Sequence, residues 1–218
     1  MSKNDIDRLK KLAEVYQPDE RQRYFSTTLE NEHEILSCIQ LNKNTPRTAI
    51  QLFETAKNLS LYSWFVYRFH QVSELTAFSA LEVALKEKYE SENPDPAKNK
   101  KRSRTTLHFL MAHAKEANWI SNEGFPSLFD RAKVFAADKK NHEKAKKHDF
   151  DKEPEMLCDE PTIQEVEDAL KAVDLVSAVT ENTNKIRNNL AHGSSTLHPN
   201  SISTLLLVSE IINQLYEQ

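Results

Sequence analysis

The sequence predicts an all-α fold, and three observations carry this prediction. Apolar residues recur every three or four positions along most of the chain, which is the period of an amphipathic helix. Few segments alternate apolar and polar residues as half-buried strands do. The 218 residues include only two glycines, Gly124 and Gly193, which argues against many tight β turns and excludes a glycine-rich phosphate loop. We expect about seven helices and no internal repeat.

Composition predicts a protein that stays in solution in a reducing compartment. Charged residues make up 28% of the chain and hydrophobic residues 39%, and no apolar run approaches the ~20 residues needed to cross a bilayer. The first residues lack the apolar core of a secretory signal. Cys38 and Cys158 form no CxxC pair, so neither a zinc site nor a disulfide is expected. We predict a cytoplasmic protein with no membrane partner, no metal and no cofactor.

Residues 1–58 are expected to form an additional N-terminal helical layer. The spacing of apolar residues predicts one helix over residues 6–16 and another over 28–41. A third helix is predicted to open at Thr45-Pro46, with threonine as its cap and proline in its first turn. Residues 59–218 are expected to form the main helical domain, joined to the N-terminal layer in one unit.

The strongest core-helix pattern covers residues 60–89, and a second core helix is predicted over 106–120. Glu74 and Glu82 on the first of these helices are expected to belong to its polar face, with a supporting role beside a functional motif left open. The apolar side chains that we expect in the core are Phe65, Phe69, Val72, Leu75, Phe78, Leu81, Leu85, Leu107, Leu110, Met111 and Ala114.

Two charged segments interrupt the helical pattern. Residues 91–104 combine two prolines with clustered basic side chains, and residues 138–161 form a charged run that we expect to be a loop or lid. Most such runs are solvated surface, and the functional alternative is contact with RNA phosphates. The basic side chains assigned to that alternative are Lys98, Lys100, Lys101, Arg102, Arg104, Lys144, Lys146 and Lys147.

The C-terminal third predicts one long helix and one short helix. Thr162 and Glu165 have the spacing of a capping box, and apolar residues continue at helical intervals as far as Leu190. Gly193 is expected to end the long helix, because it adopts the left-handed cap conformation that other residues avoid. A final helix is predicted over residues 201–216.

Residues 187–193, RNNLAHG, carry the candidate chemistry. An arginine presents a rigid fork of donors that suits a phosphate, and a histidine moves a proton near neutral pH. Positions five apart are ~140° apart on a regular helix, so Arg187 and His192 converge only if the helix ends near His192. Asn188 or Asn189 can hold a phosphate oxygen or orient the imidazole. The structural alternative is a helix end where a cation and an imidazole complement the helix dipole.

The string RNNLAH resembles the RN-x-x-x-H motif of HEPN domains, in the variant with four residues between the arginine and the histidine. Its place near the end of a long helix and before a short final one also fits. The segments SELTAFSALEVALKEKY and LHFLMAHAKEANWI look like earlier helices of prokaryotic HEPN proteins. The resemblance covers roughly residues 60–218 and implies an all-α, HEPN-like helical bundle.

The resemblance further implies a homodimer in which two RN-x-x-x-H motifs face each other across one cleft. Many such proteins are metal-independent endoribonucleases that act as toxins or in phage defence, so RNA and an antitoxin or regulatory partner are expected. Arg187, Asn188 and His192 are then the catalytic residues. HEPN toxins paired with a nucleotidyltransferase antitoxin commonly carry a tyrosine two residues after the histidine, and Ser194 stands there in this chain. Regulation by modification of that tyrosine is therefore not expected.

Two other functional classes remain open on the sequence. A HEPN-like module can bind RNA or a nucleotide without cutting it, and a helical interaction protein can use the motif only as a dimer contact. Metal binding by His108 with His113, or by His142 with His148, lacks a carboxylate or cysteine at a familiar spacing.

Overall fold

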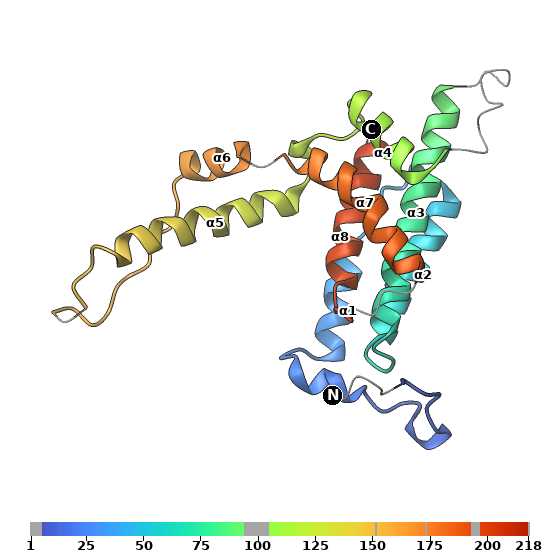
Figure 1. Cartoon of the computed structure of the whole chain (residues 1–218), viewed down its shortest axis with the longest axis horizontal. Coiled ribbons are helices and arrows are strands. Elements are labelled where there is room, and N and C mark those ends of the chain that lie inside the picture. The colour runs from blue at the N-terminus through green and yellow to red at the C-terminus, as the bar shows by residue number, and fades with distance from the viewer. Residues whose placement is uncertain (1–5, 94–104, 151, 173, 193–196, 218) are drawn as a thin grey trace.

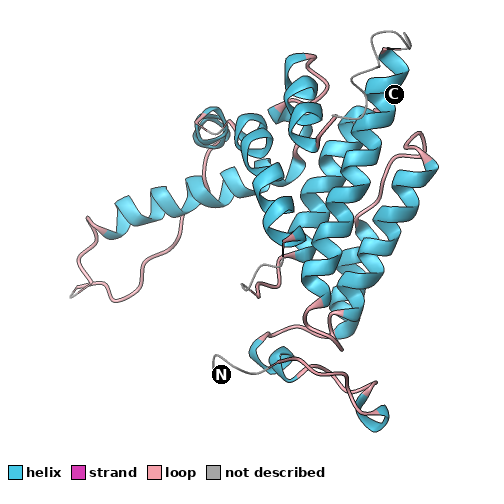
Figure 2. Ribbon diagram, turned by 45° about the vertical axis from the view of Figure 1, so that its right-hand side comes forward, coloured by secondary structure: helices cyan, strands magenta, loops and turns pink. Residues whose placement is uncertain are grey.

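A computed structural model describes residues 6–93, 105–150, 152–172, 174–192 and 197–217, and within these ranges it contains helices and connecting segments but no strand (Figure 1, Figure 2). The all-α prediction is confirmed. None of the helices in the same ranges has the length and apolar character needed to span a membrane. The described α-helices are α1 (Leu29–Cys38), α2 (Arg47–Tyr62), α3 (Phe69–Glu92), α4 (Leu107–Glu116), α5 (Pro126–Ala145), α6 (Ile163–Lys171), α7 (Leu175–Ala191) and α8 (Ser201–Leu215).

Helix α3 is the centre of the bundle, because α2, α4, α7 and α8 all pack against it. Helix α8 runs parallel to α3, since His70 contacts Ser201 at the start of the two helices and the hydroxyl of Tyr216, at the end of α8, donates to the carbonyl of Ala84 farther along α3 (2.8 Å). Burying one large aliphatic or aromatic side chain stabilises a fold by about 1.5–3 kcal/mol. The largest fully buried apolar side chains are Phe53, Leu81, Leu85, Leu110, Met111, Phe125, Leu205, Val208, Ile211 and Ile212.

A buried polar network ties α2, α3 and α8 together around His70, whose exposed fraction is 6%. Its Nδ1 lies 2.7 Å from the Ser201 hydroxyl, and its Nε2 lies 3.1 Å from the Ser63 hydroxyl. Ser60 and Ser201 share a hydrogen bond of 2.7 Å, and Ser63 donates to the Ser60 carbonyl (2.6 Å). One set of donors satisfies every group with a neutral imidazole. In this set the Ser60 hydroxyl donates to Ser201, the Ser201 hydroxyl donates to Nδ1 of His70, and the Nε2–H of His70 donates to the Ser63 hydroxyl.

Helices α5 and α6 form an arm that extends from the bundle (Figure 1). A small apolar cluster of Ala132, Ala136 and Val166 packs the two helices together. The N-cap residue of α5, Phe125, has no side-chain acceptor, and the buried Glu210 of α8 replaces it. Glu210 accepts hydrogen bonds of 2.7 Å from both the backbone N–H and the hydroxyl of Ser127. These two bonds fix the start of the arm to the core of the bundle.

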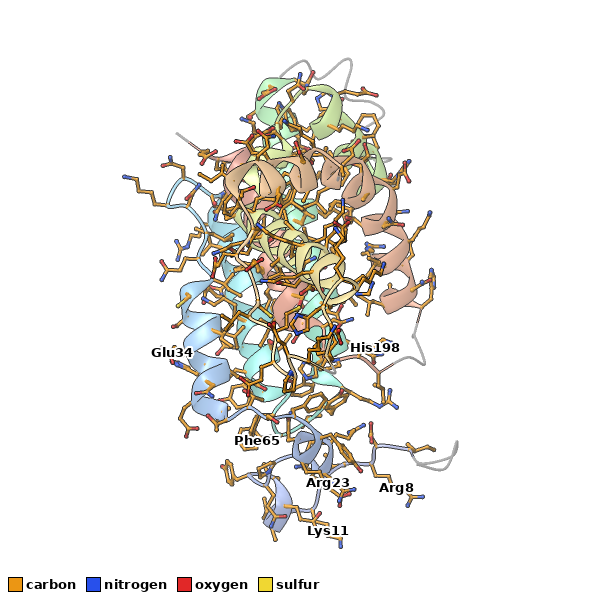
Figure 3. The ribbon with its side chains drawn as sticks, turned by 90° about the vertical axis from the view of Figure 1, so that its left-hand side faces the viewer. Arg8, Lys11, Arg23, Glu34, Phe65 and His198 are labelled. Atoms are coloured by element: carbon orange, nitrogen blue, oxygen red, sulfur yellow. The ribbon has the colours of Figure 1, made fainter. Side chains whose placement is uncertain are left out.

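The N-terminal segment corrects one prediction. Residues 6–16 are not an α-helix; they hold one short 3-10 helix, Leu12–Glu14, and leave Leu9 and Leu12 almost fully exposed. A helix of this length is marginal in water unless its apolar face packs on a core. Figure 3 shows Arg8, Lys11 and Arg23 at one end of the molecule, beyond the bundle.

Ion pairs hold this N-terminal segment in place instead of a packed helix. Asp7 accepts from Arg68 (2.6 Å) and from Arg21 (3.2 Å), and Asp19 pairs with Arg21 (2.7 Å). The Asp19 N–H also donates to the Trp64 carbonyl (2.8 Å). The segment is therefore anchored on the turn between α2 and α3.

Three helix boundaries also differ from the predictions. The expected helix over 60–89 is broken by a turn between Tyr62 and Phe69. Phe78, Leu81 and Leu85 of its predicted core face are buried, whereas Val72 is exposed. The long C-terminal helix is divided into α6 and α7, although its predicted capping box at Thr162 is present. The expected loop over 138–161 begins only after Ala145, where α5 ends.

The start of α2 differs as well, and its extent crosses the expected domain boundary. Pro46, not Thr45, occupies the cap position, and the buried hydroxyl of Thr45 has no hydrogen-bond partner among the described residues. The expected boundary at residue 58 falls inside α2, whose buried Phe53 and Ala56 belong to the same core as α3 and α8.

The pH dependence of stability tests the buried network. Burial lowers the pKa of His70 from 6.5 to about 4, against an opposing effect of the Asp19 charge. Between pH 6.5 and about 4 the unfolded chain binds a proton that the folded chain resists, so stability falls as the pH falls. We expect His70 to account for a loss of about 3 kcal/mol across that window, measured by urea unfolding.

His70→Gln provides the comparison, because glutamine hydrogen-bonds both serines without titrating. The variant should lack that part of the acid destabilisation while other groups, such as the buried Glu32 and Glu74, continue to titrate as in the wild type. An identical pH slope for both proteins would show that His70 is not held neutral by the fold.

Candidate functional site at the end of helix α7

Helix α7 is fixed in rotation by its buried face. Asp174 caps its first turn by accepting from the Ser177 N–H (2.9 Å). Val176 and Val179 are buried in the main core. The Thr183 hydroxyl is satisfied within the helix, donating 2.7 Å to the Val179 carbonyl. Because Arg187 follows Thr183 by four positions, it lies on the same side of the helix.

Arg187 lies at the edge of the interface between α7 and α3. Its Nη2 is 3.4 Å from Oε2 of Glu82, and its Nη1 donates to Oδ1 of Asn188 at 3.3 Å. The exposed fractions of the two side chains are 37% for Arg187 and 30% for Glu82. The guanidinium is therefore oriented by the protein and still open to water, so an anion can approach it.

Glu82 is a residue that the sequence placed on a polar face, with a supporting role beside the motif left open. The structure brings it to Arg187 across 105 positions of sequence. A carboxylate four residues from an arginine on one helix is visible in a sequence, whereas this pairing depends on how α3 and α7 cross. Its charge partly neutralises Arg187 and would compete with a bound phosphate.

His192 is the C-cap residue of α7, and its side chain is exposed. Its backbone N–H donates to the Asn188 carbonyl (2.9 Å), which continues the helical pattern to this residue. The imidazole takes no hydrogen bond from the described residues. Gly193 and Ser194 lie outside the described residues.

The two motif side chains are not joined within one chain. Helix α7 is regular through Ala191, so Arg187 and His192 point from different sides of it. No hydrogen bond connects them in the described structure. One copy of the chain therefore presents a guanidinium with its amide neighbour on the α3 side, and an unengaged imidazole at the helix end.

The basic residues assigned to RNA binding fall in two places. Lys98, Lys100, Lys101, Arg102 and Arg104 lie outside the described residues. Lys146 and Lys147 are exposed just after the end of α5, at the far end of the arm from the bundle (Figure 1).

The side chain of Lys144 is bound to other groups of the protein. Its Nζ donates to the Leu157 carbonyl (2.9 Å) and pairs with Asp159 (2.8 Å). It thereby holds the returning chain against α5. The structure does not bring these lysines together with Arg187.

The histidines considered as metal ligands have other surroundings. His113 packs edge-on against Tyr89 and Trp119, at 4.9 Å between ring centroids in both cases. His148 lies 2.7 Å from the Glu153 carbonyl and packs against Phe150. Within the described ranges, no three histidine, cysteine or acidic side chains are grouped as a metal site would need.

Comparison of the chain with protein-family models, with curated protein sequences and with solved structures found no match. The geometry at the end of α7 therefore carries the functional argument.

A double-mutant cycle tests whether Arg187 is held mainly for stability. The ion pair with Glu82 is partly exposed, so its coupling energy should be about 1 kcal/mol or less, and it should shrink with added salt. The measurement compares urea unfolding of the wild type, Glu82→Gln, Arg187→Gln and the double variant. A coupling of several kcal/mol that resists salt would instead make the pair a structural element of the bundle.

Proposed function

We propose that this protein is a metal-independent endoribonuclease of the HEPN type. The observation that carries the proposal is the arrangement at the end of α7. There Arg187 is partly exposed and is oriented by Asn188, and His192 is exposed. The three residues have RN-x-x-x-H spacing and lie in an all-α bundle. The proposed biological role is that of a toxin or phage-defence effector in the cytoplasm, restrained by an antitoxin or another regulatory partner.

The proposed reaction is transfer of the phosphate onto the neighbouring ribose oxygen. The 2′-oxygen loses its proton to a base and bonds to phosphorus, while the bond from phosphorus to the 5′-oxygen breaks and that oxygen takes a proton from an acid. The products are a 2′,3′-cyclic phosphate and a 5′-hydroxyl. His192 moves protons, Arg187 stabilises charge on the phosphate oxygens, and Asn188 holds Arg187 or a phosphate oxygen. The 2′-hydroxyl restricts the reaction to RNA.

A homodimer supplies what one chain lacks. The reaction needs a histidine beside the arginine that stabilises the phosphate, whereas the end of α7 directs its histidine away from the arginine of its own chain. Two copies related by a two-fold axis would place the arginine of one motif beside the histidine of the other. We propose that the two motifs face each other in this way.

A binding module that does not cleave RNA is the second candidate. The observation that favours it is the pairing of Arg187 with Glu82, because an arginine already neutralised by a carboxylate gives less stabilisation to a developing phosphate charge. This candidate requires that the wild type and His192→Ala bind RNA equally and that neither cleaves it.

Substitutions in the motif should abolish cleavage without unfolding the protein. We expect His192→Ala and Arg187→Lys each to lower the cleavage rate about 10²–10⁴-fold, because one removes the proton carrier and the other the bidentate fork. The assay follows total RNA in the presence of a chelator, with circular dichroism as the check on folding. His198→Ala is the matched control, since His198 is exposed on the segment before α8 (Figure 3). Equal rates for all four proteins would refute the assignment.

Mixing two inactive variants tests the shared site. A heterodimer of Arg187→Ala and His192→Ala retains one pairing of an intact arginine with an intact histidine from the other copy. Activity should therefore return to a substantial part of the wild-type rate when the variants are unfolded together and refolded. If affinity tags show that heterodimers form and no activity returns, the two residues act within one chain.

A further inference from the structure

A cavity of about 810 Å³ lies between the arm and the bundle, where no sequence motif predicts a site. Its walls are mainly apolar and come from α5, α6, α7 and α8, with Leu128, Phe135, Ile186 and Leu207 among them. Glu74 of α3 is the acidic residue in its lining. A mainly apolar pocket of this size with a few polar groups is the usual form of a small-molecule site.

The carboxyl group of Glu74 determines which kind of ligand this cavity would bind. The exposed fraction of Glu74 is 7%, so most of the side chain is buried. Oε2 accepts a hydrogen bond from the Thr204 hydroxyl (3.1 Å), and the described residues give Oε1 no hydrogen-bond partner. Burial raises the pKa of Glu74, and the Thr204 hydrogen bond partly opposes that effect. The carboxyl group therefore lacks a donor that a bound molecule can supply.

The other charged group at the cavity does not neutralise Glu74. Arg131 also lines the cavity, but its side chain is exposed and forms no ion pair with a described carboxylate. Water screens a charge at such a position far more than it screens a buried one. The remaining polar lining, which includes Asn200 and Ser203, is uncharged.

We propose that this cavity binds a small organic cation that carries an apolar group, with an amidinium or ammonium donating to Glu74. Its N–H groups pair with the open oxygen of the buried carboxylate, and its apolar body covers Leu128, Phe135, Ile186 and Leu207. A charged donor is favoured over a neutral one, because a hydrogen bond between ionised partners is stronger than one between an ion and a neutral group. The proposal does not rest on RNA cleavage, since it uses neither Arg187 nor His192.

Benzamidine is the probe for this site, and benzamide is its neutral counterpart of nearly the same shape. Calorimetry should show saturable binding of benzamidine to the wild type at up to millimolar concentration, and binding of benzamide at least about tenfold weaker. Methyl NMR should place the shifts at Leu128, Ile186 and Leu207. Equal binding of the two probes, no saturable binding, or shifts confined to another surface would overturn the proposal.

Variants separate the carboxylate from general effects of charge. Glu74→Gln keeps an acceptor for Thr204 and should weaken benzamidine binding at least about tenfold, whereas Glu87→Gln, an exposed change on the same helix, should leave it unaltered. If Glu74→Gln does not fold, Ser203→Trp replaces it, because this exposed residue lines the cavity and a large ring there should block binding. Unchanged affinity in the folded variant tested would contradict the assignment.

Discussion

The buried face of α3 is the constraint on which the rest of the structure depends. Four helices pack against it, and polar contacts fix their register at successive levels. His70 meets Ser201 near its start, Glu74 meets Thr204 one turn later, and Glu82 meets Arg187 farther along. A one-residue shift of α8 along α3 would leave buried polar groups without partners, and each of these costs about 1–3 kcal/mol. Apolar burial supplies the driving force, and the buried pairs of His70 with Ser201 and of Glu74 with Thr204 set the register of α8 on α3.

The sequence was sufficient where a helix carries its own signals. Helix α4 begins at Thr106 and α6 at the capping box of Thr162, and α8 covers nearly the predicted residues, because caps and apolar spacing are local properties. Residues 6–16 have a helical pattern but no core surface to cover, so pattern alone misled the prediction. The turn between α2 and α3 contains neither glycine nor proline, and neither do residues 172–174 between α6 and α7, so the usual helix-breaking residues mark neither position.

The candidate site also combines features that the local sequence predicts with features that depend on contacts between distant parts of the chain. The motif residues and their place at a helix end follow from the sequence, since both depend on neighbours within one helix. The contact of Arg187 with Glu82 and the cavity around Glu74 depend on how helices far apart in the chain cross. The spacing of residues along the sequence does not predict how these helices cross. Helix α3 thus provides one carboxylate to the proposed RNA-cleaving site and another to the proposed cation site.

The chemistry of the RNA ends tests the central claim most directly, namely that His192 and Arg187 cleave RNA through its own 2′-hydroxyl. Mass spectrometry of fragments made in the presence of a chelator should find 2′,3′-cyclic phosphates with 5′-hydroxyls, and a substrate with a single 2′-deoxyribose at the cut position should resist cleavage there. Fragments that end in a 3′-hydroxyl with a 5′-phosphate, or cleavage at the 2′-deoxy position, would contradict the account.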